Sequence, residues 1–300
     1  MQRTILSTAD VARLFNVTET TVKRWADEGV LRCQKTPGGH RRFVIKYVVE
    51  FAEKNNLEPL GVLQMPAHDE RAARLQMAVL ERDMDILVQG FIERALSADE
   101  GKLAGFLSYL YEHKIPLWQI YDDIIREGMR EIGERWERGE VGVDQEHRAS
   151  YETLDALARL QSQIHVKPGS GRLVVLACAG EELHEMGLRC TSYLLEAEGW
   201  QTNFLGARTP VSAIVRSIRE TKPAAVCISV TQSGHSALTG SHLREIARAA
   251  RDQGAIAVLG GRAALDKGYS QKSFDLIATT AKDLVDILDQ WTSVRAAPAN

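Results

Sequence analysis

The segment Glu182-Leu183-His184-Glu185-Met186-Gly187 has the residue types of a metal-ligand loop. An imidazole can bind a metal through one ring nitrogen, and a nearby carboxylate can accept the proton of the other nitrogen and so fix the tautomer. We therefore expect His184 to be a metal ligand and Glu182 to be its hydrogen-bond partner. Gly187 would let the backbone pass close under a bulky planar ligand. The residues alone also allow a surface histidine at a helix start.

Two further polar or glycine motifs each follow a short apolar segment. Ser229-Val230-Thr231 ends one such segment and Gly260-Gly261 ends the next. If these segments are parallel strands, their carboxyl ends lie at one edge of a sheet, where ligands bind. Ser229, Thr231, Gly260 and Gly261 are therefore candidate binding residues beside His184.

A third candidate group lies earlier in the chain, where Trp136 is followed after nine residues by Glu146-His147. We expect Trp136 to end one helix, residues 138–143 to form a loop, and Asp144 to cap the next helix. That arrangement predicts an indole and a Glu-His pair around one cavity mouth. A core tryptophan and a solvated Glu-His pair are the alternative.

The first 57 residues have the pattern of a helix-turn-helix followed by a wing. Ser7 begins a helix with Asp10 as its capping-box partner, and Thr18 caps a second helix. Pro37-Gly38-Gly39 indicates a turn between two short extended arms. The candidate DNA contacts are polar or basic and lie on the second helix or the wing: Thr20, Thr21, Lys23, Arg24, His40, Arg41 and Arg42.

The distribution of charge agrees with this interpretation. Residues 1–57 hold ten Lys and Arg against six Asp and Glu, whereas the whole chain carries a net charge of −3. A basic module on an acidic body is typical of a protein that reads DNA, because neutralised phosphates supply most non-specific affinity. A small helical domain with a solvated basic face is the alternative.

Length and periodicity divide the 300 residues into three expected domains. They are a winged helix-turn-helix (1–57), a helical bundle (71–166) and an α/β domain (171–292), joined by linkers at 57–70 and 167–171. In the bundle, Leu80, Met84, Leu87 and Phe91 share one helical face. In the third domain we expect strands at 173–177, 225–230, 255–259 and 277–278, and helices at 184–198, 210–220, 240–253 and 281–292. This alternation of strands and helices predicts a Rossmann-like or flavodoxin-like parallel sheet.

Composition limits the class of protein. The four cysteines, Cys33, Cys178, Cys190 and Cys227, lack metal-site spacing, so we expect reduced thiols in a cytoplasmic protein. The first residues contain no apolar run of signal-peptide length, and no stretch approaches 18 apolar residues, so no membrane association is expected.

The residues of the first domain closely resemble the MerR family of regulators. The resemblance rests on Ser7-Thr8-Ala9, Val17-Thr18, Arg24-Trp25, Gly29-Val30-Leu31 and the run from Pro37 to Phe43. It implies a homodimer on a near-palindromic operator. Typical members dimerise through a long coiled coil after the third helix, and here a linker and bundle replace it.

The other motifs resemble the cobalamin-binding domain of methionine synthase-like proteins and, with Trp-x9-Glu-His, the CarH-like photoreceptor regulators that use adenosylcobalamin. The resemblance implies that His184 is the lower cobalt ligand and Glu182 its partner, that Ser229 and the Gly260-Gly261 pair border the dimethylbenzimidazole tail, and that Trp136 and Glu146 contact the adenosyl group. His147 would lie at the same site or at a subunit contact. It further implies a dark tetramer that dissociates in light and releases DNA.

Three residues depart from the pattern. Glu182 stands where the usual motif has Asp, Thr231 stands where the usual Ser-x-Leu has Leu, and Glu137 stands where light-sensing members commonly have His. A carboxylate is a harder ligand than imidazole and holds cobalt less firmly. A cobalamin-sensing regulator without photochemistry is therefore a second interpretation. A third is a corrinoid methyl-transfer protein, against which the basic DNA module argues; we expect a regulator rather than an enzyme.

Overall fold

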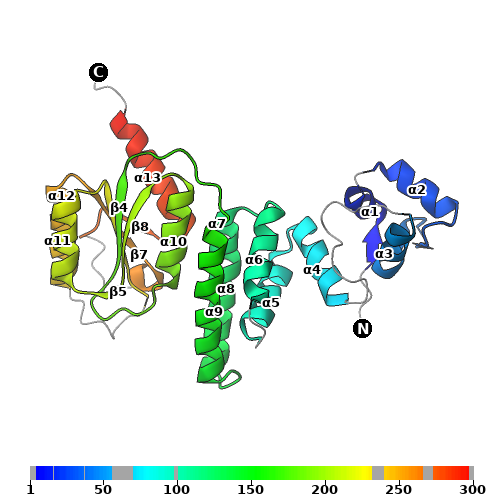
Figure 1. Ribbon diagram of the computed structural model, residues 1–300, viewed down its shortest axis with the longest axis horizontal. Coiled ribbons are helices and arrows are strands. Elements are labelled where there is room, and N and C mark those ends of the chain that lie inside the picture. Colours follow the sequence, from blue (N-terminus) through cyan, green and yellow to red (C-terminus); the bar gives the residue numbers. More distant parts are fainter. Residues whose placement is uncertain are drawn as a thin grey trace. The chain divides into compact units, whose positions relative to one another are not determined.

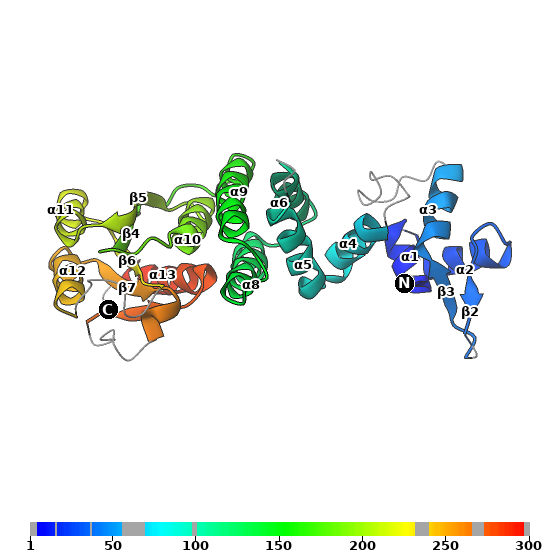
Figure 2. The ribbon, with the colours of Figure 1, turned by 90° about the horizontal axis from the view of Figure 1, so that it is seen from below.

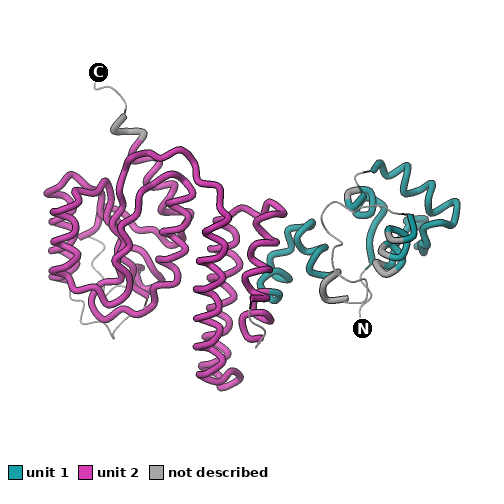
Figure 3. The backbone as a smooth tube through the Cα atoms, in the orientation of Figure 1, with its two compact units in different colours: residues 1–90 teal, residues 91–300 magenta. Residues whose placement is uncertain are grey.

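The computed structural model describes residues 5–15, 17–36, 38–55, 70–97, 101–231, 240–265 and 273–296. The chain divides into two compact units, residues 1–90 and 91–300 (Figure 3).

The first unit contains the expected helix-turn-helix and wing. Helices α1 (Thr8–Leu14) and α2 (Glu19–Asp27) precede α3 (Ile45–Lys54), and strands β1 (Ile5–Ser7), β3 (Arg41–Val44) and β2 (Gln34–Lys35) form an antiparallel sheet in that order. Both predicted caps are confirmed, since Asp10 N donates to Ser7 Oγ and Thr21 N donates to the Thr18 hydroxyl. β1 is an additional strand that the sequence pattern did not predict.

A small apolar core holds these elements together. The rings of Phe15, Trp25 and Phe51 contact one another with centroids 4.9 to 6.0 Å apart. Val22 of α2 and Phe43 of β3 are fully buried in the same cluster. The outer face of α2 is therefore left to polar residues, as its periodicity predicts.

One predicted helical face is wrong. Helix α4 (Glu70–Glu81) ends before Arg82, which has a positive φ of 58°, and α5 (Met84–Ala95) starts a new direction. Leu80 is consequently 36% exposed, whereas Leu87 and Phe91 are fully buried. A left-handed residue breaks the helical period, and apolar spacing alone does not reveal it.

The second unit begins its helical part with α6 (Lys102–Glu112). A continuous rod follows, made of α7 (Leu117–Gln119), the π-helical segment η1 (Ile120–Ile125) and α8 (Arg126–Glu137), and α9 (Val143–Gln161) returns beside it (Figure 1). The predicted breaks near Gly101, Pro116 and 139–142 are present. Asp144 is not the cap of α9; Gly142 is the N-cap residue, and its N–H donates to Gln145 Oε1.

The α/β part is a five-stranded parallel sheet in the order β5-β4-β6-β7-β8. Helices α10 (Met186–Ala197) and α13 (Ala281–Ala296) cover one face, and α11 (Val211–Thr221) and α12 (Gly240–Asp252) cover the other (Figure 2). The short helix η2 (Arg262–Leu265) follows β7. The strands are β4 (Leu173–Ala179), β5 (Gln201–Thr209), β6 (Ala225–Ser229), β7 (Ile256–Gly260) and β8 (Leu276–Ala278).

The expected parallel sheet is confirmed, but the prediction missed β5. Its sequence, Gln-Thr-Asn-Phe-Leu-Gly-Ala-Arg-Thr, has no continuous apolar run, because β5 is an edge strand with mostly half-buried residues. Buried parallel strands show such a run and edge strands need not. β5 pairs with β4 and shifts register twice along its length.

Two glycines of α8 provide a matched test of packing. A Cβ on Gly128 would overlap the ring of the fully buried Phe91, whereas one on Gly133 would meet nothing within 4 Å. Gly128→Ala should lower the free energy of unfolding by about 1–3 kcal/mol through overpacking. Gly133→Ala should raise it by up to about 1 kcal/mol through helix propensity. Denaturant titrations followed by circular dichroism measure both, and equal effects would contradict this packing.

Candidate functional site

The loop after β4 holds His184 by the carboxylate of Glu182. Glu182 is only 4% exposed, and its Oε1 accepts hydrogen bonds from the His184 main-chain N at 2.9 Å and from Nδ1 at 2.6 Å. The bond to Glu182 raises the pKa of His184 above its ordinary value, against the opposing effect of partial burial. With Nδ1 engaged in this way, Nε2 is the ring nitrogen presented to a metal.

Glu182 also joins two sheet loops. Its Oε2 accepts a hydrogen bond from the Thr231 main-chain N at 2.7 Å, so one carboxylate holds the loop after β4 and the loop after β6. Ser229, the last residue of β6, pairs in register with Gly260 of β7 and with Cys178 of β4. The structure thus brings Glu182, His184, Ser229, Thr231 and Gly260 together at the carboxyl edge of the sheet.

The three glycines of the motifs have different surroundings. A Cβ on Gly187, in the first turn of α10, would meet open space. Gly261 has a φ of +93°, and a Cβ there would collide with the Val230 main chain, so the turn itself requires glycine. At Gly260 a Cβ would be in ordinary contact with Ala278 O. Gly187 therefore leaves room for a ligand, and Gly261 shapes the backbone.

The donor set fits a planar metal-bearing ligand. The His184 side chain is 51% exposed, and the neighbouring apolar Leu183 is more exposed still. Burial raises the pKa of the nearby Cys178 thiol to about 12, and its Sγ donates to His184 O at 3.6 Å. All four cysteines are free thiols, as expected. A single imidazole beside an exposed apolar residue and an open glycine is the arrangement of an axial ligand, rather than of a multidentate metal centre.

The unpredicted strand β5 fastens this loop. The Arg208 main-chain N donates to Glu182 O at 2.9 Å, and the Ala207 N donates to Glu185 Oε2 at 2.9 Å. Arg208 adopts a positive φ of 51°, which aims its N–H at the loop. These residues carry no motif, so the sequence offered no signal for them beyond Gly206, which permits the bulge.

The bundle residues lie at the tip of the α8–α9 hairpin. Trp136 is 47% exposed, so the alternative of a core tryptophan is wrong. Glu146 accepts a hydrogen bond from the Ser150 hydroxyl at 2.9 Å and lies 3.8 Å from the exposed His147. The charge of Glu146 is also among the causes that raise the pKa of His184. Trp136 and the Glu146-His147 pair thus lie on the two arms of one hairpin.

The predicted DNA-contact residues lie on one helix and one wing. Thr20, Lys23 and Arg24 are exposed on α2, and Lys23 and Arg24 form only loose pairs with Glu19 at 3.4 Å and Glu28 at 3.9 Å. Exposed pairs of this kind are weak, so phosphate can replace them. Thr21 differs in that its main-chain N is used by the Thr18 cap.

The wing residues are not equivalent. His40 and Arg42 are exposed, but the Arg41 side chain is only 18% exposed and its guanidinium donates to Asp27 Oδ1 at 2.6 Å. This hydrogen bond from Arg41 holds the pKa of Asp27 below its ordinary value. Arg41 therefore ties the wing to the end of α2, which sequence spacing did not indicate.

Comparison with known proteins agrees with this geometry. Residues 5–56 match a helix-turn-helix domain family, residues 73–161 match a B12 binding domain family, and residues 172–285 match a second B12 binding domain family. The chain is 29% identical to the HTH-type transcriptional repressor CarH of Myxococcus xanthus over 74% of its length and 77% of CarH. It is 28% identical to the repressor CarA of the same organism over 56% of its length and about half of CarA.

A solved structure supports the fold of the second unit. The monomethylamine corrinoid protein of Methanosarcina barkeri covers 69% of this chain and 99% of its own, with 16% sequence identity and a TM-score of 0.55. At this identity the likeness concerns the fold alone.

The chain is a transcription regulator that combines a helix-turn-helix with B12-binding domains. Its order of domains and its similarity to CarH support a CarH-like cobalamin-binding regulator. Within the described ranges, the structure contains no helix long and apolar enough to cross a membrane.

Glu182 gives a direct test of the cobalamin site. Glu182→Gln removes the charge that polarises His184 and leaves one acceptor oxygen for two loops, so cobalamin affinity should fall about 10–100-fold. Glu181→Gln is the matched control, because Glu181 is exposed and its carboxylate pairs with Arg208 at 3.0 Å, away from the imidazole. Absorbance titration with hydroxocobalamin measures both, and equal affinities for the two variants would refute the role of Glu182.

Proposed function

We propose that this chain is a light-responsive transcriptional repressor that binds operator DNA as an adenosylcobalamin-dependent oligomer and releases the DNA on illumination. The observation that carries the proposal is the hydrogen bond by which the buried Glu182 holds the half-exposed His184 ring, in a chain whose α8–α9 hairpin also presents the half-exposed Trp136. The adenosyl form, the light response and the oligomer go beyond cobalamin binding and are the content of the proposal.

In this proposal, different parts of the protein would bind the two faces of the cofactor. His184 would bind cobalt from below through Nε2, and Glu182 would hold its tautomer. Ser229, Thr231 and the Gly260-Gly261 pair lie at the sheet edge where the nucleotide tail would enter. From the bundle, Trp136 would pack on the adenosyl group and Glu146 would accept a hydrogen bond from it, with His147 beside them.

The cofactor would supply a light-sensitive cobalt–carbon bond, and the protein would convert its loss into movement. Trp136 and Glu146 would contact the adenosyl group only while that group is present, so the bundle would have different contacts before and after illumination. A ligand shifts a conformational or assembly equilibrium only by its unequal affinity for the two states. An adenosyl group between bundle and sheet meets this condition.

The small DNA-binding surface of one module suits a regulator whose DNA affinity depends on oligomerisation. One α2 helix and one wing offer Thr20, Thr21, Lys23, Arg24, His40 and Arg42, which make few phosphate contacts. A homodimer or homotetramer would bring several such modules to one operator and raise occupancy through effective concentration. Loss of the oligomer would then release the DNA without any change in the module itself.

Glu137 favours a second candidate function, a cobalamin-sensing regulator without photochemistry. Glu137 is the last residue of α8 and is exposed beside Trp136. Its carboxylate would hold cobalt less firmly than an imidazole if the upper position became vacant. A corrinoid methyl-transfer role rests on fold likeness alone and does not explain the helix-turn-helix.

Illumination separates the two regulator functions. Protein loaded with adenosylcobalamin in the dark should elute as a homodimer or homotetramer and become smaller after green light. Size-exclusion chromatography with light scattering measures this, and methylcobalamin and hydroxocobalamin serve as ligand controls. His184→Ala should lose both the bound cofactor and the light response. An unchanged mass after complete photolysis would reject the photoreceptor and leave the cobalamin sensor.

Salt dependence tests the DNA contacts. Arg24→Ala removes one phosphate or base contact, so operator affinity should fall, and the slope of log affinity against log salt should decrease by about 0.9 if the contact is a phosphate. Arg219→Ala makes the same charge change on an exposed position of α11 and should leave both quantities unchanged. Fluorescence anisotropy at several salt concentrations measures them, and matching curves for the two variants would contradict the placement of α2.

A further inference from the structure

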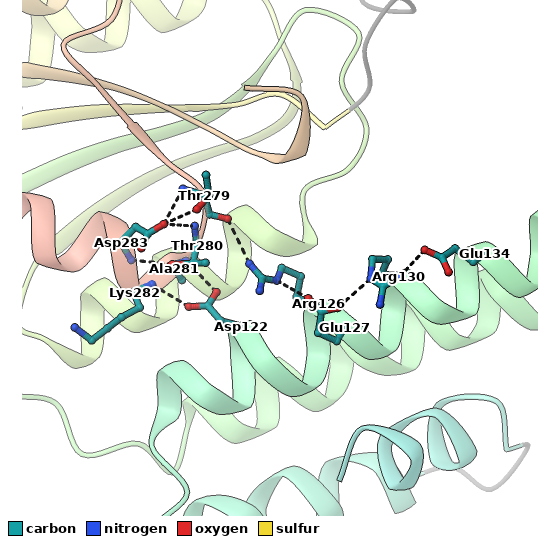
Figure 4. Close-up of polar contacts among 10 residues, drawn as sticks. All are labelled: Asp122, Arg126, Glu127, Arg130, Glu134, Thr279, Thr280, Ala281, Lys282 and Asp283. Carbon is teal, nitrogen blue, oxygen red and sulfur yellow. Dashed lines mark hydrogen bonds and ion pairs between the residues drawn. The ribbon is translucent and has the colours of Figure 1, made fainter. Parts of the chain in front are cut away.

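Asp122 is a buried acid outside both proposed binding sites. It lies in η1 of the bundle rod, is 6% exposed, and its carboxylate reaches the first turn of α13 in the α/β part, about 160 residues later in the chain (Figure 4). Oδ1 accepts from the Ala281 main-chain N at 2.9 Å, and Oδ2 accepts from the Lys282 main-chain N at 3.0 Å.

The first turn of α13 depends on this carboxylate. A helix leaves its first N–H groups without intrahelical partners. The local cap serves only part of them: Asp283 N donates to the Thr280 hydroxyl, and Thr279 N and Thr280 N donate to Asp283 Oδ2. The N–H groups of Ala281 and Lys282 remain, and Asp122 accepts both. An acid at this helix end also meets the positive end of the helix dipole.

The neighbouring residues of the rod add to the same contact. Tyr121 is fully buried, and burial is the main cause that raises its pKa. Arg126 donates to Thr279 O at 3.4 Å. The π-helical turn and the start of α8 thus both reach the segment that begins α13, and π-helical turns often occur at functional positions.

The bundle is also attached to the α/β part at the end of α9. Gln161 Nε2 donates to Glu196 Oε2 of α10 at 2.8 Å, and residues 162–172 then lead into β4. A body attached at one place can pivot about it, and a second attachment restrains the pivot. Asp122 supplies that second attachment from a different helix.

Helix α8 connects the Asp122 contact to the hairpin tip that bears Trp136. Arg126, Glu127, Arg130 and Glu134 form a ladder of ion pairs along α8, from the Asp122 contact toward the end that bears Trp136 (Figure 4). Ten residues of helix separate Arg126 from Trp136, a length of about 15 Å. A small rotation at Asp122 therefore moves the tip of the hairpin much further.

We propose that Asp122 is a positioning residue that locks the helical bundle against the α/β domain and thereby holds Trp136 and Glu146 over the His184 loop. The lock is a property of the protein alone, whereas its effect on the upper ligand rests on the function proposed above. The chemistry is the capture of two main-chain N–H groups by one carboxylate, so only a residue with two acceptor oxygens at this place performs it fully.

A distance measurement tests the lock without cobalamin. Spin labels on Tyr151→Cys of α9 and Arg219→Cys of α11, both exposed positions, report the separation of bundle and α/β domain in the full chain. Cys33 is replaced by Ser, the other three thiols are buried, and unlabelled protein is added in excess to suppress signals between chains. Asp122→Ala should widen the distance distribution at least twofold.

Asp123→Ala is the matched control, because Asp123 is the next residue, is half-exposed and hydrogen-bonds within its own rod to Gln119. It should keep the parent distribution. A distribution for Asp122→Ala as narrow as that of the parent overturns the lock. If circular dichroism shows that this variant does not fold, Asp122→Asn, which keeps one acceptor, replaces it; intermediate widening supports the lock, and no widening overturns it.

Cobalamin titrations then test the link to the upper ligand. Asp122→Ala should reduce the preference for adenosylcobalamin over hydroxocobalamin about tenfold, whereas His184→Ala should weaken both. Widened distances with an unchanged preference would overturn the positioning of Trp136 and Glu146 while the lock stands. If the parent protein itself shows no such preference, the proposed function fails, and the distance distributions alone still decide whether Asp122 locks the two domains.

Discussion

The geometry of the His184 loop depends on one carboxylate, whose two oxygens accept hydrogen bonds from three N–H groups. Glu182 accepts from the His184 ring, from the His184 main chain and from Thr231, so it sets the direction of the imidazole and joins two loops of the sheet. Burying a charged group without partners is costly, and here each oxygen is satisfied. The longer side chain found in place of the usual Asp still reaches the ring, at 2.6 Å.

Asp122 follows the same rule in another place, since it too is a buried carboxylate that accepts main-chain N–H groups from a distant segment. In both cases a carboxylate accepts a main-chain N–H that lies far along the chain: Thr231 N for Glu182, and Ala281 N and Lys282 N for Asp122. Buried hydrogen bonds of this kind specify one geometry. Two apolar surfaces can shift against each other at little cost, whereas a shift here would leave buried polar groups without partners. Two acids thus fix the His184 loop and the start of α13 by hydrogen bonds.

Sequence patterns predicted what periodicity and short motifs encode. The caps of Ser7 and Thr18, the parallel sheet and the His184 loop belong to this group. The misses have physical causes: β5 lacks an apolar run because it is an edge strand, and Arg82 breaks a helical face by a left-handed φ. The Arg41–Asp27 pair and the contact of Asp122 with α13 join residues that are distant in the sequence, so local residue spacing does not predict them.

Strand β5, which the sequence did not predict, also limits how two copies of this chain can associate. An edge strand offers main-chain groups with which another chain could extend the sheet. β5 is bulged, carries the positive-φ residues Gly206 and Arg208, and exposes the charged side chain of Arg208. Bulges and charges of this kind blunt an edge against strand addition. Two copies that met at this edge would therefore be held by side chains, and such a contact can separate without breaking a row of main-chain hydrogen bonds.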